Sequence, residues 1–151
     1  MCSMNPSDAS PGASDAVSPE EAGLLAAAWE IRGAALCPFS NFAVGAALLD
    51  GEGRVWTGAN VENASYTLGL CAERVAIFYA LTHGAREFKC VAVVTGAAEP
   101  SSPCGACRQI LHEFAPDAVI ISAVADGRLL RTTVRELLPY GFDASSLTTR
   151  A

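Results

Sequence analysis

The chain has 151 residues, of which 51% are hydrophobic, and its formal net charge is −6. This length is that of one ordinary domain built around a single core. The acidic balance disfavours nucleic acid as a partner, because a phosphate backbone is bound mainly by Lys and Arg. No apolar run approaches the roughly 20 residues of a membrane-spanning helix, so no membrane partner is expected.

The segment 1–17 predicts a disordered tail, because its residues are small and polar and include proline. It has neither the basic nor the apolar region of a secretory signal, so we expect a cytoplasmic protein. Thiols stay reduced in that compartment. The six cysteines are therefore expected to be ligands or buried apolar residues, and not a disulfide framework.

Ordered structure is predicted from Ser18 onward, as one domain over residues 18–151. Ser18 and Glu21 have the spacing of a capping box, and Pro19 suits the first position of a helix. Apolar residues such as Leu24 and Ala28 then recur at helical spacing. The first element is therefore predicted to be a helix with one face to bury.

Two strands joined by a glycine-containing turn are predicted next, and helices then alternate with short apolar strands. The predicted strands are residues 42–50, 54–61, 90–96 and 118–125. The helices predicted after the hairpin are residues 71–82, a helix that starts at residue 104, and residues 132–139. Short β-branched strands of this kind lie buried inside sheets. The pattern predicts an α/β domain in which a mixed sheet lies between helical layers.

Cysteines open two of these helices. Cys71 stands at the start of one, and Cys104 and Cys107 stand in the first turn of the other. Residues three positions apart share a helix face, so Cys104 and Cys107 can bind one ion. If the two helix starts pack together, Cys71 becomes a third ligand. Three protein ligands leave an open position on tetrahedral zinc, which is typical of catalytic sites.

Glu73 follows Cys71 by two residues, where its carboxyl group could act as general acid and base on a zinc-activated water. Three thiolates and one Zn²⁺ leave about one excess negative charge. Two helix N-termini, each carrying roughly half a positive charge, would point at the site. Arg74 and Arg108 are predicted to donate to thiolate sulfur and so add counter-charge.

Two other kinds of site fit part of this pattern. Cys104-Gly105-Ala106-Cys107 alone could be a thioredoxin-like redox pair, but that interpretation leaves Cys71 and Glu73 without a role. A closed structural zinc site would need a fourth protein ligand, and none falls at a natural spacing. Both alternatives rank below a catalytic metal site.

The segments "NVENASYTLGLCAER" and "SPCGACRQIL" resemble the zinc-dependent cytidine deaminases, in particular the small homotetrameric type with three cysteine ligands. The resemblance implies a three-layer α-β-α fold with a mixed sheet of about five strands, and one zinc ion per chain. It also implies pyrimidine salvage, in which free cytidine and 2′-deoxycytidine are hydrolysed to uridine and 2′-deoxyuridine plus ammonia.

The resemblance assigns a role to each matching residue. Hydroxide attacks C4 of the cytosine ring while Glu73 shuttles protons, and Asn60 and Glu62 bind the sugar. Phe42 lies against the base, and the backbone of Ala72 contacts its polar edge. The zinc ligands are Cys71, Cys104 and Cys107, and residues lent to a neighbouring subunit's site are Ala64, Ser65, Tyr66 and Phe142.

The chain departs from the family pattern at two positions that bear on subunit packing and substrate preference. Leu36 stands where an aromatic residue is common, and Phe39 stands where tyrosine is common, so one hydroxyl group is absent. Within the family, a deaminase of nucleic acid would need a basic groove that this acidic chain lacks. A deaminase of another cytosine nucleoside or a nucleoside antibiotic remains the alternative.

Overall fold

The computed structural model of the chain describes residues 16–147, so most of the tail predicted for residues 1–17 lies outside the described residues. Its centre is a five-stranded sheet with the strand order β2-β1-β3-β4-β5. The strands are β1 (Val44–Asp50), β2 (Val55–Ala59), β3 (Phe88–Thr95), β4 (Val119–Ala123) and β5 (Leu129–Thr133). Strands β3 and β4 are parallel, and the other neighbours are antiparallel. The mixed sheet is thereby confirmed.

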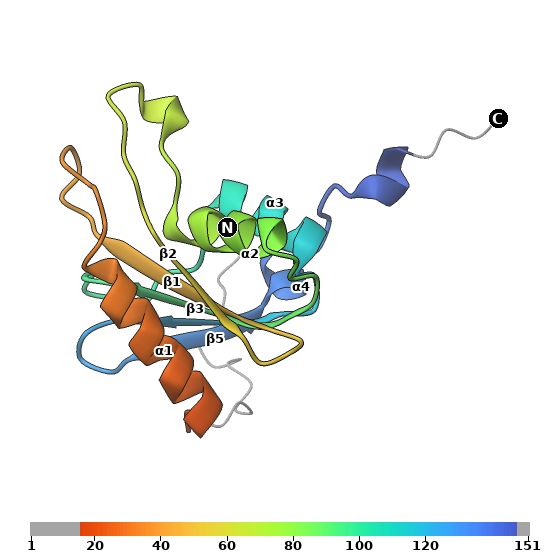
Figure 1. Ribbon diagram of the computed structural model, residues 1–151, viewed down its shortest axis with the longest axis horizontal. Coiled ribbons are helices and arrows are strands. Elements are labelled where there is room, and N and C mark those ends of the chain that lie inside the picture. Colours follow the sequence, from red (N-terminus) through yellow and green to blue (C-terminus); the bar gives the residue numbers. More distant parts are fainter. Residues whose placement is uncertain (1–15, 148–151) are drawn as a thin grey trace, which may run out of the picture.

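Helix α1 (Pro19–Arg32) covers one face of the sheet (Figure 1). It begins with the predicted capping box, in which Ser18 and Glu21 satisfy each other's backbone N–H groups. Leu24 and Ala28 are buried against β1 and β3. Gly45 permits this close packing, because a Cβ atom there would lie 2.0 Å from the carbonyl oxygen of Ala28.

The opposite face is covered by α2 (Ala72–Thr82), α3 (Gly105–Phe114) and the short α4 (Val134–Leu137) (Figure 1). The main core lies between these helices and the sheet, and it includes the fully buried Ile77, Val91 and Ile120. Gly58 lets α2 approach β2, because a Cβ atom there would lie 2.5 Å from the backbone nitrogen of Ala76. The three-layer arrangement follows from these two packed faces. None of the described helices is long and apolar enough to cross a membrane.

The structure differs from the prediction by one additional strand and by the starts of two elements. The strand β5 was not predicted, and the helix expected over residues 132–139 begins only at Val134, with Thr133 as its N-cap. This strand lies at the sheet edge, so its side chains are half-exposed and lack a buried apolar run. Strand β1 also starts at Val44, which pairs with Thr95, and not at Phe42, whose carbonyl oxygen accepts from the Asn60 side chain.

The hairpin between β1 and β2 is organised by the buried carboxylate of Asp50. It accepts hydrogen bonds from Arg54 Nε and Trp56 Nε1, both 2.8 Å long, and from the backbone N–H groups of Glu52 and Arg54. Burial by itself would raise the pKa of Asp50, but these hydrogen bonds outweigh it and lower the pKa to about 2. The charged carboxylate therefore stabilises the folded state at neutral pH.

We expect Asp50→Asn to lower the free energy of unfolding by about 1–3 kcal/mol, because a hydrogen-bonded buried charge is lost. Because the folded pKa is depressed, this contribution is full above the unfolded value and is lost as pH falls through the folded one. In urea unfolding, the difference from the natural chain should thus shrink between about pH 5 and about pH 2.5. Asp126→Asn, at an exposed ion pair, is the matched control. Equal stability of the Asp50 variant and the natural chain at neutral pH would contradict this role.

Candidate functional site

Two helix N-termini bring the three predicted cysteines together. Cys71 is the N-cap of α2, Cys104 is the N-cap of α3, and Cys107 lies in the first turn of α3. The Sγ atom of Cys104 lies 3.7 Å from that of Cys71 and 3.5 Å from that of Cys107. All three sulfur atoms lie within 4.8 Å of one another. Segments more than 30 residues apart thus form one cluster.

The spacing of the sulfur atoms fits a zinc ion. A tetrahedral ion with Zn–S bonds of about 2.3 Å holds its sulfurs about 3.8 Å apart, close to the two measured distances. Among the described residues, the cluster contains no fourth Cys, His, Asp or Glu. Cys71 and Cys104 line an adjacent cavity. The donor set therefore suits zinc with one position left open towards the cavity.

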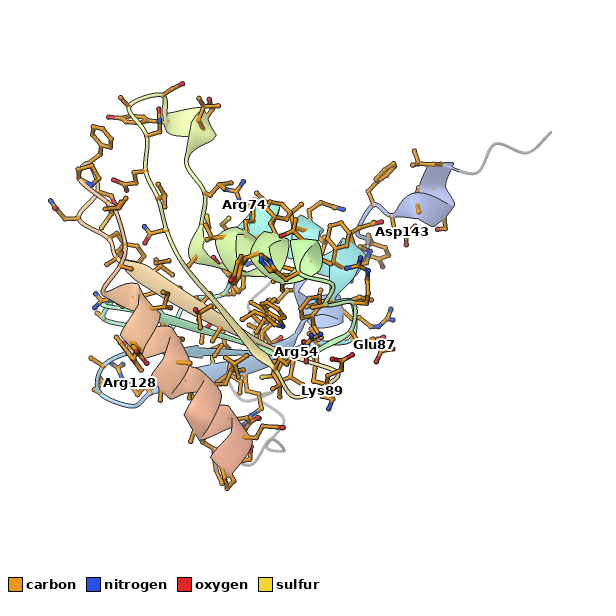
Figure 2. The ribbon with its side chains drawn as sticks, viewed as in Figure 1. Arg54, Arg74, Glu87, Lys89, Arg128 and Asp143 are labelled. Atoms are coloured by element: carbon orange, nitrogen blue, oxygen red, sulfur yellow. The ribbon has the colours of Figure 1, made fainter. Side chains whose placement is uncertain are left out.

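The surroundings of Cys71 and Cys107 shift the pKa values of the two thiols in opposite directions. A hydrogen bond from Cys107 and the neighbouring Arg74 guanidinium lower the pKa of Cys71 to about 5. The same hydrogen bond favours the protonated form of Cys107 and, together with burial, raises the pKa of Cys107. Arg74 Nη2 lies 3.7 Å from Cys71 Sγ and 3.3 Å from the carbonyl oxygen of Gly69. Figure 2 shows Arg74 beside the first turn of α2. The Arg74 guanidinium therefore favours the thiolate form of Cys71.

Glu73 is the acidic group of the site. It lies in the first turn of α2, lines the same cavity as Cys71 and Cys104, and is only 4% exposed. Burial raises the pKa of Glu73, and the negative charge of Cys71 raises it further. A carboxyl group with a raised pKa beside a metal centre is able both to accept and to return a proton near neutral pH.

A cavity of about 630 Å³ opens above Glu73 and the cysteines. A volume of this size accommodates a small organic ligand. It is lined by residues from the loops before β1 and after β2, from the start of α2, and from the loop after β3. The predicted site residues that line it are Phe42, Asn60, Glu62, Tyr66, Cys71, Glu73, Arg74 and Cys104.

Asn60 and Glu62 already organise the cavity rim. Asn60 Oδ1 accepts from the backbone N–H of Val44, and Asn60 Nδ2 donates to the carbonyl oxygen of Phe42, each at 2.8 Å. The Glu62 carboxylate accepts from the backbone N–H groups of Phe39 and Ser40 and from the Ser40 hydroxyl. The Ser40 hydroxyl is the main cause that lowers the pKa of Glu62. Both side chains therefore hold the segment that carries Phe42.

The side chains of several predicted residues do not line this cavity. Ala64 and Ser65 are exposed in the long connection between β2 and α2, and Ala72 is fully buried. Phe142 is 56% exposed on the C-terminal segment, which projects from the helical layer together with Asp143 (Figures 1 and 2). One protomer therefore does not bring Ala64, Ser65 or Phe142 into its own cavity, whereas Ala72 stands in the chain between the lining residues Cys71 and Glu73.

Arg108 does not occupy the predicted place beside a sulfur atom. Its Nε donates to the carbonyl oxygen of Pro103 at 2.7 Å, and its Nη2 donates to Ser102 Oγ at 2.6 Å. Its Nη1 donates to the carbonyl oxygen of Leu137 at 3.3 Å. All these acceptors are oxygen atoms, so of the two arginines only Arg74 is hydrogen-bonded to a sulfur.

Sequence reasoning also missed part of the cavity wall. Val93 and Thr95 from the end of β3, and Ser101 and Ser102 from the following loop, line the cavity. None of them has a distinctive residue type. The available signal was their position after a buried strand, since ligands in α/β sheets bind beyond the carboxyl ends of strands.

Comparisons with known proteins agree with this geometry. Residues 20–123, which include the three cysteines and Glu73, match the family described as the cytidine and deoxycytidylate deaminase zinc-binding region. A cytidine deaminase from Halalkalibacterium halodurans is 45% identical over 125 residues, which cover 82% of this chain and 95% of that protein. One from Sporosarcina psychrophila is 42% identical, with coverage of 82% and 92%.

Solved structures show the same fold. The cytidine deaminase of Burkholderia pseudomallei superimposes with a TM-score of 0.77 at 43% identity, over 80% of this chain and 98% of that one. The cytidine deaminase of Mycobacterium tuberculosis has a TM-score of 0.70 at 37% identity, over 80% and 95%. These matches confirm the α-β-α fold predicted from the sequence.

We expect protein purified without chelator to contain about one zinc ion per chain, measured by elemental analysis, because three thiolates complete the site. Cys104→Ser should lose nearly all of this zinc. Cys37→Ser is the matched control, since Cys37 is a free cysteine outside the cluster and should leave zinc content unchanged. Full zinc content in the Cys104 variant would rule out the assigned ligand set.

Proposed function

The chain belongs to the cytidine and deoxycytidylate deaminase family, and we propose that it hydrolyses free cytidine and 2′-deoxycytidine to uridine and 2′-deoxyuridine plus ammonia. The observation that carries this proposal is the buried Glu73 beside a three-cysteine metal centre at the base of an open cavity. Hydrolytic deamination needs an activated water and a group that moves protons, and these parts can supply both.

Cys71, Cys104 and Cys107 would hold the zinc ion, which when bound would supply the Lewis acidity that makes water acidic enough to deprotonate near neutral pH. Glu73 would take a proton from that water and deliver it to N3 of the pyrimidine ring while the water oxygen bonds to C4. Glu73 would then take the remaining proton from the new C4 hydroxyl and pass it to the amino group. The C4–N bond breaks, ammonia leaves, and the C4 oxygen becomes the carbonyl of uracil. Its raised pKa suits it to hold the proton between these transfers.

The charges around the cavity favour a nucleoside over a nucleotide such as deoxycytidylate. Arg74 is the only Lys or Arg among the described residues that line the cavity. Its guanidinium is already bound to Cys71 and Gly69. A 5′-phosphate would carry close to two negative charges into a cavity that also presents the Glu62 carboxylate. The proposed substrate is therefore uncharged at the 5′ position.

Sugar and base recognition is assigned to the cavity rim. A carboxylate has about four acceptor positions, and Glu62 uses three of them within the chain, so one remains for a sugar hydroxyl. Asn60 Oδ1 likewise has a second lone pair. Phe42 is 44% exposed and lines the cavity, where its ring can lie against a pyrimidine. The backbone of Ala72 is the proposed contact to the polar edge of the base.

The proposed assembly is a homotetramer in which neighbouring subunits complete each other's sites. Large apolar side chains are exposed around the cavity mouth and on the C-terminal segment, which supports an interface there. They include Leu36 at 62%, Tyr66 at 78%, Leu68 at 69% and Phe142 at 56%. Phe39 packs edge-on against Tyr66 with ring centroids 5.6 Å apart, so its missing hydroxyl leaves this contact intact. Ala64, Ser65, Tyr66 and Phe142 are the residues proposed to reach a neighbour's site.

Pyrimidine salvage in the cytoplasm is the proposed setting. The described cysteines at positions 37, 71, 90, 104 and 107 are all free thiols. A metal site built from three thiolates is compatible with a reducing compartment, where competing disulfides do not form. The relatives reported above are named for cytidine, which does not favour a nucleoside antibiotic as substrate.

The proposed reaction is tested by the ultraviolet absorbance of cytidine mixed with purified protein. Conversion to the spectrum of uridine should be lost after zinc removal and restored by added zinc, because the metal activates the water. Glu73→Gln should lower turnover by about 10²–10⁴-fold while zinc content stays unchanged, because the amide does not shuttle protons.

The matched control for this variant is Glu113→Gln, on an exposed side chain at the end of α3, which should keep full turnover. Near-normal turnover of the Glu73 variant would remove Glu73 from the mechanism. No conversion of cytidine by zinc-loaded natural protein would refute the proposed substrate.

Assembly is tested by light scattering of the zinc-loaded protein. We expect a mass close to four times the 15.6 kDa chain. Phe142→Ala should lower kcat/KM while zinc content stays unchanged, because the ring is proposed to act in a neighbour's cavity. This substitution removes only the ring of Phe142, so Gly141 and the neighbouring residues keep their backbone contacts. An active monomer would contradict the shared sites.

A further inference from the structure

One wall of the cavity is formed by a loop, a segment without helix or strand. Residues 96–103 connect β3 to α3, and Ser101 and Ser102 in this connection line the cavity next to Cys104. In the described part of the chain, none of the peptide groups of residues 97–103 is hydrogen-bonded to another backbone group. A wall with no backbone ladder depends on side chains for its position.

Two arginines supply that support at opposite ends of the wall. Arg128 binds the outer end through the carbonyl oxygen of Ala98 and the Glu99 carboxylate, but its side chain is 51% exposed. Exposed pairs of this kind contribute little. Arg108 binds the inner end, at Ser102 and Pro103, from a partly buried position. The inner end is the part that faces the cavity.

The Arg108 guanidinium connects three separate points. Its Nε and Nη2 hold Pro103 and Ser102, and its Nη1 reaches the carbonyl oxygen of Leu137 at the end of α4. Pro103 is fully buried, and it directly precedes the ligand Cys104. Because the guanidinium is planar and rigid, these bonds fix the wall relative to both α3 and α4.

We propose that Arg108 is a positioning residue that fixes the cavity wall at Ser102 and Pro103 through the fork shape of its guanidinium, and not through its charge. It is bonded to no sulfur atom and does not itself line the cavity, so it acts on the substrate through the wall residue Ser102, to which it is bonded. The wall sets the width of the cavity beside Cys104 and Glu73. Displacement of such a wall weakens substrate positioning.

Only the kinetic consequence of this inference rests on the proposed deaminase function. Arg108→Lys keeps the positive charge but has one nitrogen, which cannot reach three separate acceptors. In zinc-loaded protein, we expect this variant to keep its zinc and to lower kcat/KM by roughly 10–100-fold, mainly through a higher KM. Hydrogen exchange measured by mass spectrometry should become faster in peptides covering residues 97–103.

Arg135→Lys is the matched control, because Arg135 pairs with Asp117 on the surface and makes no contact with the wall. It should keep both the KM and the exchange rate of the natural chain. Ser102→Ala removes the Nη2 contact but also a hydroxyl group of the cavity wall, so only its hydrogen exchange is compared, and exchange over residues 97–103 should rise by less than in Arg108→Lys. This second variant tests the idea even where Arg108→Lys folds poorly.

Three results would overturn the proposal. If Arg108→Lys has the natural KM and the natural exchange rate, the charge suffices and the fork shape is irrelevant. If it loses zinc, Arg108 acts on the metal centre and not on the wall. If neither Arg108→Lys nor Ser102→Ala changes exchange over residues 97–103, the wall is held by other groups. The exchange and zinc measurements need no turnover, so a wrong substrate would not be mistaken for failure of this inference.

Discussion

The meeting of two helix N-termini at one point is the constraint on which the site depends. Three sulfur atoms within 4.8 Å of one another would repel as thiolates without compensation. The N-termini of α2 and α3 each direct roughly half a positive charge at them. Arg74 adds a guanidinium 3.7 Å from Cys71 Sγ. Close packing of α2 on the sheet, which Gly58 permits, is therefore a requirement of the metal chemistry as well as of the core.

The cavity rim shows how binding groups are held before a ligand arrives. Asn60 and Glu62 have polar atoms suited to a sugar, yet most of their hydrogen-bonding capacity is used on the backbone of residues 39–44. This arrangement fixes both side chains in single orientations, so less conformational entropy is lost when a ligand binds. It also ties the aromatic ring of Phe42 to the same network. The proposed sugar-binding and base-binding groups are therefore mechanically coupled.

Sequence reasoning succeeded where the signal was local. The capping box of Ser18 and Glu21 and the i, i+3 spacing of Cys104 and Cys107 depend on a single helical turn, and the structure contains both. It failed where partners were distant in sequence or the pattern was weak. Strand β5 lies at a sheet edge, where two leucines and three polar residues are half-exposed or exposed. Arg108 reaches across 29 residues to Leu137, a contact that no local pattern indicates.

The different partners of the two arginines follow from the charge of the centre. Three thiolates and one Zn²⁺ leave about one negative charge, and two helix N-termini together offset about the same amount. One guanidinium on Cys71 then makes the surroundings mildly positive. A second guanidinium on sulfur would draw further electron density from the ligands without being needed for neutrality. Arg108, although it follows Cys107 directly, is therefore available to bind oxygen atoms, and its effect on the site is geometric.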